Sequence, residues 1–262
     1  MVHGRDRHVL HVQRTEKAGV SIHSPAAPPG PRATFTIVIP TLNEARVIEH
    51  TLRVTLQRGF DDIVVVDGGS SDGTGALIEA MAARARSVRL LSSLPGRARQ
   101  LNAGAAAAAG DVFLFLHADS HLPPSAKRVL EDTLSDPAVV GGRFDVCFDR
   151  PSMWGAIIST LMNVRSRISR ISTGDQAIFV RRQVFERLGG YSDIPIMEDI
   201  DFSTRLKQAG RTAAIRDRVM TSFRRWERDG PLRTILLMWS LRFLYWIGVS
   251  PHRLTRLYAA VR

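Results

Sequence analysis

Apolar residues gather in short blocks between residues 35 and 116, and polar residues separate these blocks. Four blocks rich in β-branched and aromatic side chains predict buried strands at 35–40, 63–67, 88–91 and 112–116. Segments with helical spacing follow the first three of them, at 44–57, 74–86 and 97–109. Strands that alternate with helices of this length indicate βαβ units. The predicted fold class is therefore α/β, with a Rossmann-like, mainly parallel sheet flanked by helices.

Beyond residue 137 this alternation weakens. The pattern predicts an exposed or antiparallel strand at 139–148, a helix at 154–168, a strand at 176–180 and a helix at 200–208 that ends at Gly210. We expect this half to be an α+β extension that closes over the first half and shares its sheet.

The two ends of the chain differ from the part between them. We expect an extension at 1–33, a main domain at 34–228 and a basic amphipathic helical segment at 229–262. The extension holds four of the eight histidines and ends in prolines, which predicts disorder, and nothing in it resembles a signal peptide. An apolar run at 235–249 is shorter than the roughly 20 residues of a spanning helix. Flanking arginines favour a helix in a membrane interface, with a core or dimer helix as the alternative.

Composition narrows the classes of protein. Of the 262 residues, 44% are hydrophobic and 23% are charged, as in a globular protein. The single cysteine, Cys147, excludes an intrachain disulfide and a cysteine-based zinc cluster. The net charge is +11, and all but three of the 36 basic residues are arginines, which suit phosphate-bearing partners. A solvated basic face explains the same charge, so nucleic acid, anionic lipid and a phosphorylated substrate stay open at this point.

Polar side chains follow three of the predicted strands, at 41–44, 67–72 and 117–120. In a parallel sheet, ligands bind at the edge where the strands end. Asp67 can accept hydrogen bonds from a nucleotide base, although an aspartate followed by glycines also makes an ordinary turn. Asp119 is placed to hold a divalent cation against a diphosphate.

Three carboxylates, those of Glu198, Asp199 and Asp201, occupy the start of the helix predicted near residue 200. The helix dipole stabilises acids there, which is a purely structural explanation. Clustered carboxylates also raise one another's pKa, which suits a general base. No G-x-G-x-x-G motif or Walker loop is present, which disfavours dinucleotide and NTPase sites.

Seven motifs occur in the order found in a known family. They are TIVIPTLNE at 36–44, VVVDGGSSDGT at 64–74, GRARQLNAG at 96–104, FLFLHAD at 113–119, TGDQA at 173–177, MED at 197–199 and RRW at 224–226. Together they resemble the family 2 glycosyltransferases of GT-A fold, in particular the bacterial radical-SAM/selenodomain-associated subgroup. The resemblance covers the chain from Phe35 to its C-terminus.

This resemblance implies an inverting transfer of a sugar from a nucleotide diphosphate donor to a hydroxyl or phosphate acceptor, with a divalent cation, Mn²⁺ or Mg²⁺. It implies that Asp199, beside Glu198, deprotonates the acceptor and that Asp119 is the metal ligand of the D-x-D motif. The residues expected to line the donor site are Pro40, Thr41, Asn43, Glu44, Asp67, Gly69, Arg97, Asn102, His117 and Ala118. Those expected near the acceptor or the diphosphate are Gly174, Asp175, Gln176, Arg224, Arg225 and Trp226.

One residue departs from the family pattern, because His117 stands where D-x-D has its first aspartate. A neutral imidazole can ligate Mn²⁺ but suits Mg²⁺ poorly, so Asp119 and the diphosphate alone are the alternative way to hold the cation. UDP and GDP donors both stay open. We expect a lipid-linked acceptor and a cytoplasmic protein at the inner face of the cell membrane. The oligomeric state stays open, a dimer included.

Two other functions fit parts of the sequence. A sugar-nucleotide nucleotidyltransferase has a similar fold, but the glycine-, arginine- and lysine-containing loop of such enzymes is replaced here by residues 40–44. A non-catalytic protein that binds anionic lipid or nucleic acid explains the last 60 residues, where 13 Lys/Arg outnumber 3 Asp/Glu. It leaves the placed carboxylates unexplained, so nucleic acid is not expected as a partner.

Overall fold

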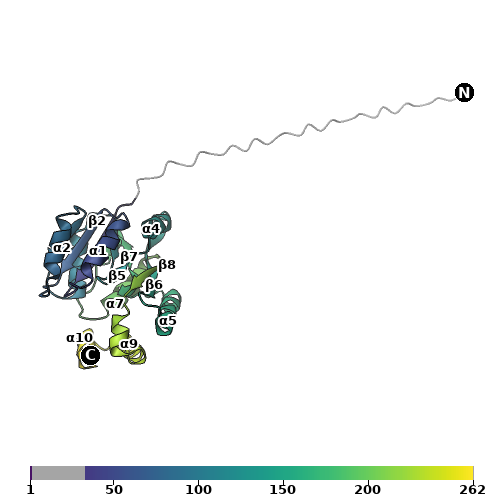
Figure 1. Cartoon of the computed structure of the whole chain (residues 1–262). Coiled ribbons are helices and arrows are strands. Elements are labelled where there is room, and N and C mark those ends of the chain that lie inside the picture. The colour runs from purple at the N-terminus through teal and green to yellow at the C-terminus, as the bar shows by residue number, and fades with distance from the viewer. Residues whose placement is uncertain (2–32, 262) are drawn as a thin grey trace. The chain divides into compact units, whose positions relative to one another are not determined.

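Eight strands form one sheet, in the order β3-β2-β1-β4-β7-β6-β8-β5 (Figure 1). A computed structural model describes Met1 and residues 33–261, with side chains described as far as residue 258, so the extension predicted at 1–33 falls almost wholly outside the described residues. The strands are β1 (Phe35–Thr41), β2 (Asp62–Asp67), β3 (Val88–Ser92), β4 (Val112–Phe115), β5 (Ser120–His121), β6 (Val139–Phe148), β7 (Phe179–Arg181) and β8 (Arg211–Thr221).

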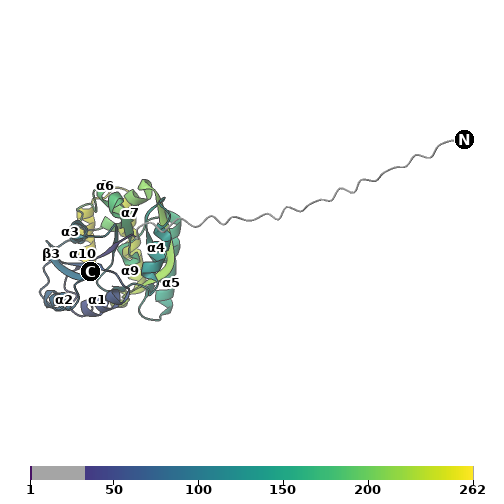
Figure 2. The same cartoon turned by 90° about the horizontal axis from the view of Figure 1, so that it is seen from above.

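The first four strands are parallel. β1, β2 and β4 are buried on both faces, as their continuous apolar runs predict, whereas β3 lies at the edge of the sheet and is fully buried only at Val88. Side chains alternate between the faces, so Ile37 and Ile39 join one core cluster while Val38 between them joins the other. The first cluster packs against α1 (Ile48–Gln57), α2 (Thr74–Ala82) and α4 (Ala126–Leu134). The second packs against α3 (Arg97–Ala107), α6 (Arg182–Arg187) and α7 (Glu198–Ala209), on the opposite face (Figure 2).

The second half extends the same sheet, as expected, but its strands differ from the prediction. β6 was expected to be exposed or antiparallel; it is antiparallel to β7, which confirms the second alternative, but it is largely buried and is also parallel to β8. The strand predicted at 176–180 is a short 3₁₀ turn, η1 (Gly174–Gln176), followed by β7. β8 was not predicted, because its alternating arginines and its three central alanine and isoleucine residues do not form a clear apolar run. β5, α4 and α6 were not predicted either.

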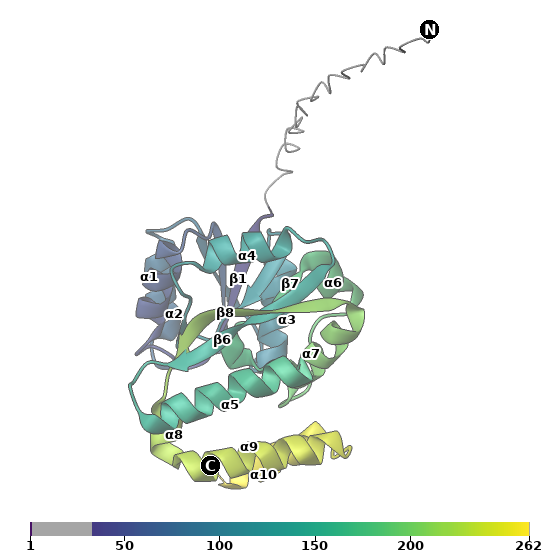
Figure 3. The same ribbon diagram turned by 90° about the vertical axis from the view of Figure 1, so that its right-hand side faces the viewer.

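The C-terminal part contains α5 (Met153–Ser169), α8 (Arg224–Asp229), α9 (Pro231–Trp246) and α10 (Pro251–Val261). The single helix expected after residue 229 is therefore a pair of helices. Leu241 of α9 and Leu254 of α10 pack with Met197, directly before α7, so this pair is anchored to the start of that helix. α5 and α9 lie side by side (Figure 3). Within the described part of the chain, no helix combines the length and the apolar character needed to cross a membrane.

Close packing of α3 on the sheet depends on one glycine. A Cβ atom added to Gly104 would lie 2.3 Å from Cγ1 of Val38 and 3.0 Å from Cγ2 of Val66. Both valines are fully buried in the two central strands, so neither side chain has room to move away. Gly104 therefore sets the distance between α3, which begins at Arg97, and the strand ends beside it.

We expect Gly104→Ala to lower the free energy of unfolding by about 1–3 kcal/mol, because the added methyl overpacks this interface. The matched control is Gly75→Ala in α2, where an added Cβ meets nothing within 4 Å. That change should raise stability by about 0.4–1 kcal/mol through the lower entropy of the unfolded chain. Urea denaturation of both variants tests the pair, and equal effects of the two substitutions would contradict this account.

Candidate functional site

The loops after β1 and β2 are joined at the carboxyl edge of the sheet. Asn43, with a φ of 56°, donates from its backbone N–H to Oγ of Ser70 at 2.8 Å and accepts from the backbone N–H of Ser71 at 2.9 Å. The backbone N–H of Glu44 donates to Oγ1 of Thr74 at 2.9 Å. The predicted donor residues at 40–44 therefore lie directly against the loop that begins at Asp67.

Asp67 is almost fully buried and its carboxylate is occupied by its own turn. Oδ2 accepts from the backbone N–H groups of Gly69 and Ser70 at 3.2 and 2.9 Å. Oδ1 accepts from the hydroxyls of Ser70 and Thr41, at 2.5 and 3.3 Å. Four donors match the acceptor capacity of a carboxylate, so the turn explanation accounts for every contact seen. A contact with a nucleotide base stays a prediction that requires the Ser70 hydroxyl to turn away.

Glu44 and Asp119 converge on one guanidinium. Nη2 of Arg224 lies 3.4 Å from Oε2 of Glu44 and 3.5 Å from Oδ2 of Asp119. Burial and the charge of Asp119 raise the pKa of Glu44, against the opposing charge of Arg224. The pairing of Ser120 in β5 with Thr221 in β8 explains why Asp119 and Arg224 lie close together. Asp119 directly precedes β5, and Arg224 follows β8 by three residues.

His117 is engaged with an acid of the TGDQA motif rather than with Asp119. Its Nδ1 lies 3.0 Å from Oδ1 of Asp175. Partial burial would raise the pKa of Asp175, but the hydrogen bond and charge of His117, together with the charge of Arg97, lower it to about 2. The other side of the imidazole packs closely against Gly174, because a Cβ atom added there would lie 2.3 Å from Nε2 of His117.

Glu198 and Asp199 begin α7, as predicted, beside the same loop. Oδ2 of Asp199 accepts from the backbone N–H of Gly174 at 2.8 Å. Glu198 is buried, with Oε1 3.9 Å from Nε of Arg97. Burial and the charge of Asp199 raise the pKa of Glu198, and the charge of Arg97 opposes this. The third predicted carboxylate, Asp201, pairs away from them, with Arg205.

Arg97 connects the two groups of acids. Burial would lower the pKa of its guanidinium, but the negative charges around it outweigh this and raise the pKa. These charges belong to Glu198, Asp175, Asp199 and Asp119. A narrow cavity of about 10 Å³ brings the same parts of the chain together, and its lining includes Arg97, His117, Gly174, Tyr191, Glu198 and Asp199. Residues from four separate sequence motifs thus share one site.

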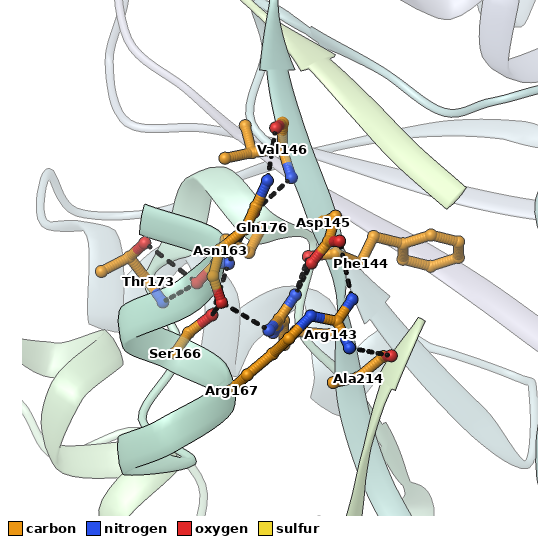
Figure 4. A network of polar contacts seen from close by, with 10 residues as sticks. All are labelled: Arg143, Phe144, Asp145, Val146, Asn163, Ser166, Arg167, Thr173, Gln176 and Ala214. Atoms are coloured by element: carbon orange, nitrogen blue, oxygen red, sulfur yellow. Dashed lines mark hydrogen bonds and ion pairs between the residues drawn. The ribbon is translucent and has the colours of Figure 1, made fainter. Parts of the chain in front are cut away.

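The loop that carries Gly174 and Asp175 is fixed from behind by a polar network (Figure 4). Gln176 is fully buried, and its Nε2 donates to Oγ of Ser166 in α5 at 2.9 Å. Asn163 lies one turn earlier in α5. Its Oδ1 accepts from the backbone N–H of Val146 at 2.9 Å, and its Nδ2 donates to the backbone carbonyl of the same residue at 3.0 Å. This chain of bonds ties the loop to β6 through α5. Gln176 therefore positions the loop, whereas the sequence analysis placed it near the acceptor.

The comparisons with known proteins agree with this arrangement. The family model described as Glycosyl transferase family 2 matches residues 36–189, which is more than half of the chain. The chain belongs to glycosyl transferase family 2. The chain is 26% identical over 196 residues to the probable glycosyltransferase YdaM of Bacillus subtilis (strain 168). That match covers 67% of this chain and 47% of YdaM, so the chain spans about half the length of this relative.

Solved structures of glycosyltransferases share the fold of this family 2 chain. The mannosyltransferase PcManGT from Pyrobaculum calidifontis, in complex with GDP-Man and Mn²⁺, has a TM-score of 0.58 and 24% identity, over 73% of this chain and 57% of that one. Residues 1–349 of TarS from S. aureus, in complex with UDP-GlcNAc, have a TM-score of 0.58 and 15% identity, over 72% and 58%. At these identities the likeness shows the fold alone, and it confirms the GT-A fold.

Three residues expected in the donor or acceptor sites of this family 2 chain have contacts within the chain, and their contact with a ligand stays a prediction. The side-chain amide of Asn102 is bonded to the backbone of Tyr191: its Nδ2 donates to the carbonyl at 2.8 Å, and its Oδ1 accepts from the N–H at 2.9 Å. Ala118 is buried, and its carbonyl accepts from the hydroxyl of Thr51 at 2.6 Å. Trp226 stacks edge-on against Phe148, with ring centroids 6.1 Å apart.

Three residues beside the site were not predicted. Tyr191 lines the cavity, and burial with the charge of Asp199 raises the pKa of its hydroxyl well above the ordinary value. Arg165 in α5 and Arg242 in α9 carry charges that act on Asp199. Only Arg242 had a sequence signal, because it interrupts the apolar run at 235–249. Arg165 shares α5 with Arg167 and several polar residues, so it does not stand out there.

The raised pKa of Glu198 predicts a pH-dependent stability. The folded protein binds a proton at Glu198 more readily than the unfolded chain, so wild-type stability falls as pH rises through the interval between 4.5 and the raised value. The side chain that Glu198→Gln introduces carries no charge at any pH. We expect this variant to be at least as stable as the wild type at pH 7 and to lose that advantage below about pH 4.5.

Urea denaturation at pH 7 and pH 4 measures this difference. Glu79→Gln, at an exposed position of α2, is the control for removing one negative charge. A Glu198→Gln variant that is less stable than the wild type at pH 7 would mean that attraction to Arg97 outweighs burial.

Proposed function

We propose that this chain is an inverting glycosyltransferase that moves a sugar from a nucleotide diphosphate to a hydroxyl or phosphate acceptor. The observation that carries the proposal is the position of Arg97, whose guanidinium lies 3.9 Å from Oε1 of Glu198 and is influenced by the charges of Asp119 and Asp199. An acid suited to the leaving diphosphate and an acid suited to the acceptor thus lie near one guanidinium. The seven ordered motifs support assignment to the radical-SAM/selenodomain-associated subgroup.

The residues around Asp119 suit a divalent cation without providing all of its ligands. Glu44 and Asp119 converge on the Arg224 guanidinium, so a positive charge is favoured between them. His117 is bonded to Asp175, and no group of three His, Cys, Asp or Glu side chains able to hold a metal occurs in the part of the chain that the structure describes. Asp119 would hold Mn²⁺ or Mg²⁺ together with diphosphate oxygens. A bound cation supplies charge neutralisation on the leaving nucleotide diphosphate.

Asp199 is the group we assign as general base. Its Oδ2 is fixed by the backbone N–H of Gly174, and its Oδ1 accepts from the backbone N–H of Ile200 at 2.7 Å, so the carboxylate has one defined orientation. The acceptor hydroxyl loses its proton to this carboxylate as its oxygen attacks the anomeric carbon. Arg97 and Arg224 hold negative charge on the donor side. Asp175, with its lowered pKa, stays ionised and keeps His117 in place.

Asp199→Asn should lower the rate of transfer by about 10²–10⁴-fold, because it removes the base while keeping the shape of the side chain. Donor binding should persist. A panel of UDP- and GDP-sugars, with and without Mn²⁺, measures it by thermal shift, since a ligand at 100 times its Kd adds about 2.7 kcal/mol of stability. Asp201→Asn, two residues along the same helix, is the control and should keep activity.

Loss of donor binding in folded Asp199→Asn would contradict the assigned role. Release of pyrophosphate from a nucleoside triphosphate and a sugar phosphate would support a nucleotidyltransferase instead. Binding of vesicles or RNA without any nucleotide-sugar response would support a non-catalytic binding protein.

We place this reaction at an anionic membrane surface, which fits a lipid-linked acceptor. The helices α5 and α9 lie side by side (Figure 3). Each of them exposes a row of apolar side chains. Arginines surround the second row, and the last 60 residues carry 13 Lys/Arg against 3 Asp/Glu. This charge complements anionic head groups better than it does a second copy of the same basic chain. The rows are Met153, Ile157, Leu161, Val164 and Ile168 in α5, and Leu232, Leu236, Trp239, Phe243 and Trp246 in α9.

The double variant Trp239→Ser/Trp246→Ser should bind vesicles of phosphatidylglycerol and phosphatidylcholine at least tenfold more weakly, a change of about 1.4 kcal/mol or more. Vesicle sedimentation measures the binding. Leu94→Ser is the control, because Leu94 is exposed in the loop after β3, outside both rows. A dimer in ultracentrifugation that the serine variant abolishes, with vesicle binding unchanged, would assign the rows to self-association.

A further inference from the structure

Two buried arginine groups have no hydrogen-bond partner. They are Nη2 of Arg165 and Nε of Arg225, and among the described residues no other buried side-chain nitrogen or oxygen is left in this state. Buried polar groups in folded proteins are nearly always bonded, so an orphaned donor calls for an explanation. Nitrogen groups that only donate call for an acceptor, and a guanidinium is best matched by a phosphate or carboxylate.

A third arginine joins them. Arg242, in α9, is partly buried, and burial lowers the pKa of its guanidinium. Burial and the charge of Arg242 together lower the pKa of Arg165 to about 10, so the two side chains lie close. Within residues 33–258, Arg165, Arg225 and Arg242 form no ion pair with a carboxylate. Three helices thus bring three positive charges near the same two acids, Asp175 and Asp199, without a direct ion pair to either.

This arginine group lies on the side of the site where Asp199 and Asp175 are. The charges of both acids act on Arg242, that of Asp199 acts on Arg165, and that of Arg225 acts on Asp175. Arg224, which pairs with Glu44 and Asp119, belongs to the donor side instead. An anion bound by the arginine group would therefore sit beside the base, while the donor diphosphate would sit beside Arg97 and Arg224.

The surroundings of the arginine group are apolar. Arg165 lies in α5 next to the exposed Leu161 and Ile168, and Arg242 lies in α9 next to the exposed Trp239 and Trp246. Arg225 packs over the ring of Tyr258, with Cζ 5.2 Å from the ring centroid. A ligand that reaches these arginines from the outside would pass between two apolar rows. That combination matches an amphiphile with an anionic head.

We infer that the acceptor is a lipid whose head group carries both a phosphate and a hydroxyl, and that Arg165, Arg225 and Arg242 bind the phosphate. This inference rests on the proposed function and adds the chemical class of the acceptor. The hydroxyl oxygen forms the new bond to the anomeric carbon, its proton passes to Asp199, and the bond from that carbon to the diphosphate breaks with its electron pair leaving on the nucleotide. Arg165 and Arg242 are thus binding residues for the acceptor.

A purely structural role explains this arginine group poorly. Three half-buried guanidinium groups without a direct ion pair to a carboxylate cost stability, since a charge taken out of water needs a counter-charge in close contact. We expect Arg165→Gln/Arg242→Gln to be at least as stable as the wild type in thermal unfolding. The control is Arg253→Gln/Arg256→Gln, which removes the same charge from exposed positions of α10.

The test uses sn-glycerol 3-phosphate as a soluble probe that carries a phosphate and hydroxyls. Thermal shift should give an apparent Kd at least tenfold weaker for Arg165→Gln/Arg242→Gln than for the wild type, and unchanged for the control pair. Inorganic phosphate at the same concentration distinguishes recognition of any phosphate from recognition of the whole head group. Vesicles of phosphatidylglycerol in phosphatidylcholine test the lipid source, and should also bind the Gln pair more weakly than the control pair.

Nucleotide-sugar thermal shifts are measured on the same variants and should be unchanged. Loss of these shifts in Arg165→Gln/Arg242→Gln would overturn the inference by assigning the arginines to the donor diphosphate. Unfolding of the Gln pair at a clearly lower temperature would overturn it by showing a structural role, and the single change Arg242→Gln repeats that comparison. No response of the wild type to glycerol phosphate or to vesicles would also overturn it. No response to any nucleotide sugar would instead contradict the proposed function.

Discussion

The attraction between Arg97 and the carboxylates around it is the interaction on which this site depends. Glu198, Asp199 and Asp175 come from two segments that pack together, and Asp119 approaches from a third. Without a cation among them, these negative charges would repel one another in a partly buried space. The guanidinium at the start of α3 allows them to coexist, and its own position follows from the close packing of α3 at Gly104.

Strand pairing decides which residues meet at this site. Parallel strands place the loops after β1 and β2 together, as any α/β sheet would. The additional pairing of β8 with β5 brings the chain back to the same edge of the sheet. Arg224 therefore lies beside Asp119, although the two residues are 105 positions apart in the sequence. A separate network from β6 through α5 holds the loop of Gly174 and Asp175. The residues predicted for the donor side and those predicted for the acceptor side are therefore supported by different parts of the fold.

Local patterns were enough to predict the first half of the fold. The four strands of the first half and the start of α7 follow from runs of apolar residues and from acids at a helix start, and the structure confirms them. β8 was missed because its partners lie far away in the sequence and its own residues are mixed. Arg165 was missed because its burial depends on α9, about 70 residues later, which no local pattern contains. The role expected of Asn102 depended on the family motif alone, and that of Asp67 on its place at the end of a strand as well, so neither pattern could reveal the contacts that both residues make within the chain.

The contact between His117 and Gly174 makes these two positions interdependent during divergence. The imidazole fits only because residue 174 has no side chain, since a Cβ there would lie 2.3 Å from Nε2. A family member that returns an aspartate to position 117 would free that space and let position 174 accept alanine or serine. The order of the two changes matters, because a side chain gained first at position 174 would displace the histidine and its hold on Asp175. Histidine at one position and glycine at the other therefore form a unit that can be inherited but not easily exchanged one residue at a time.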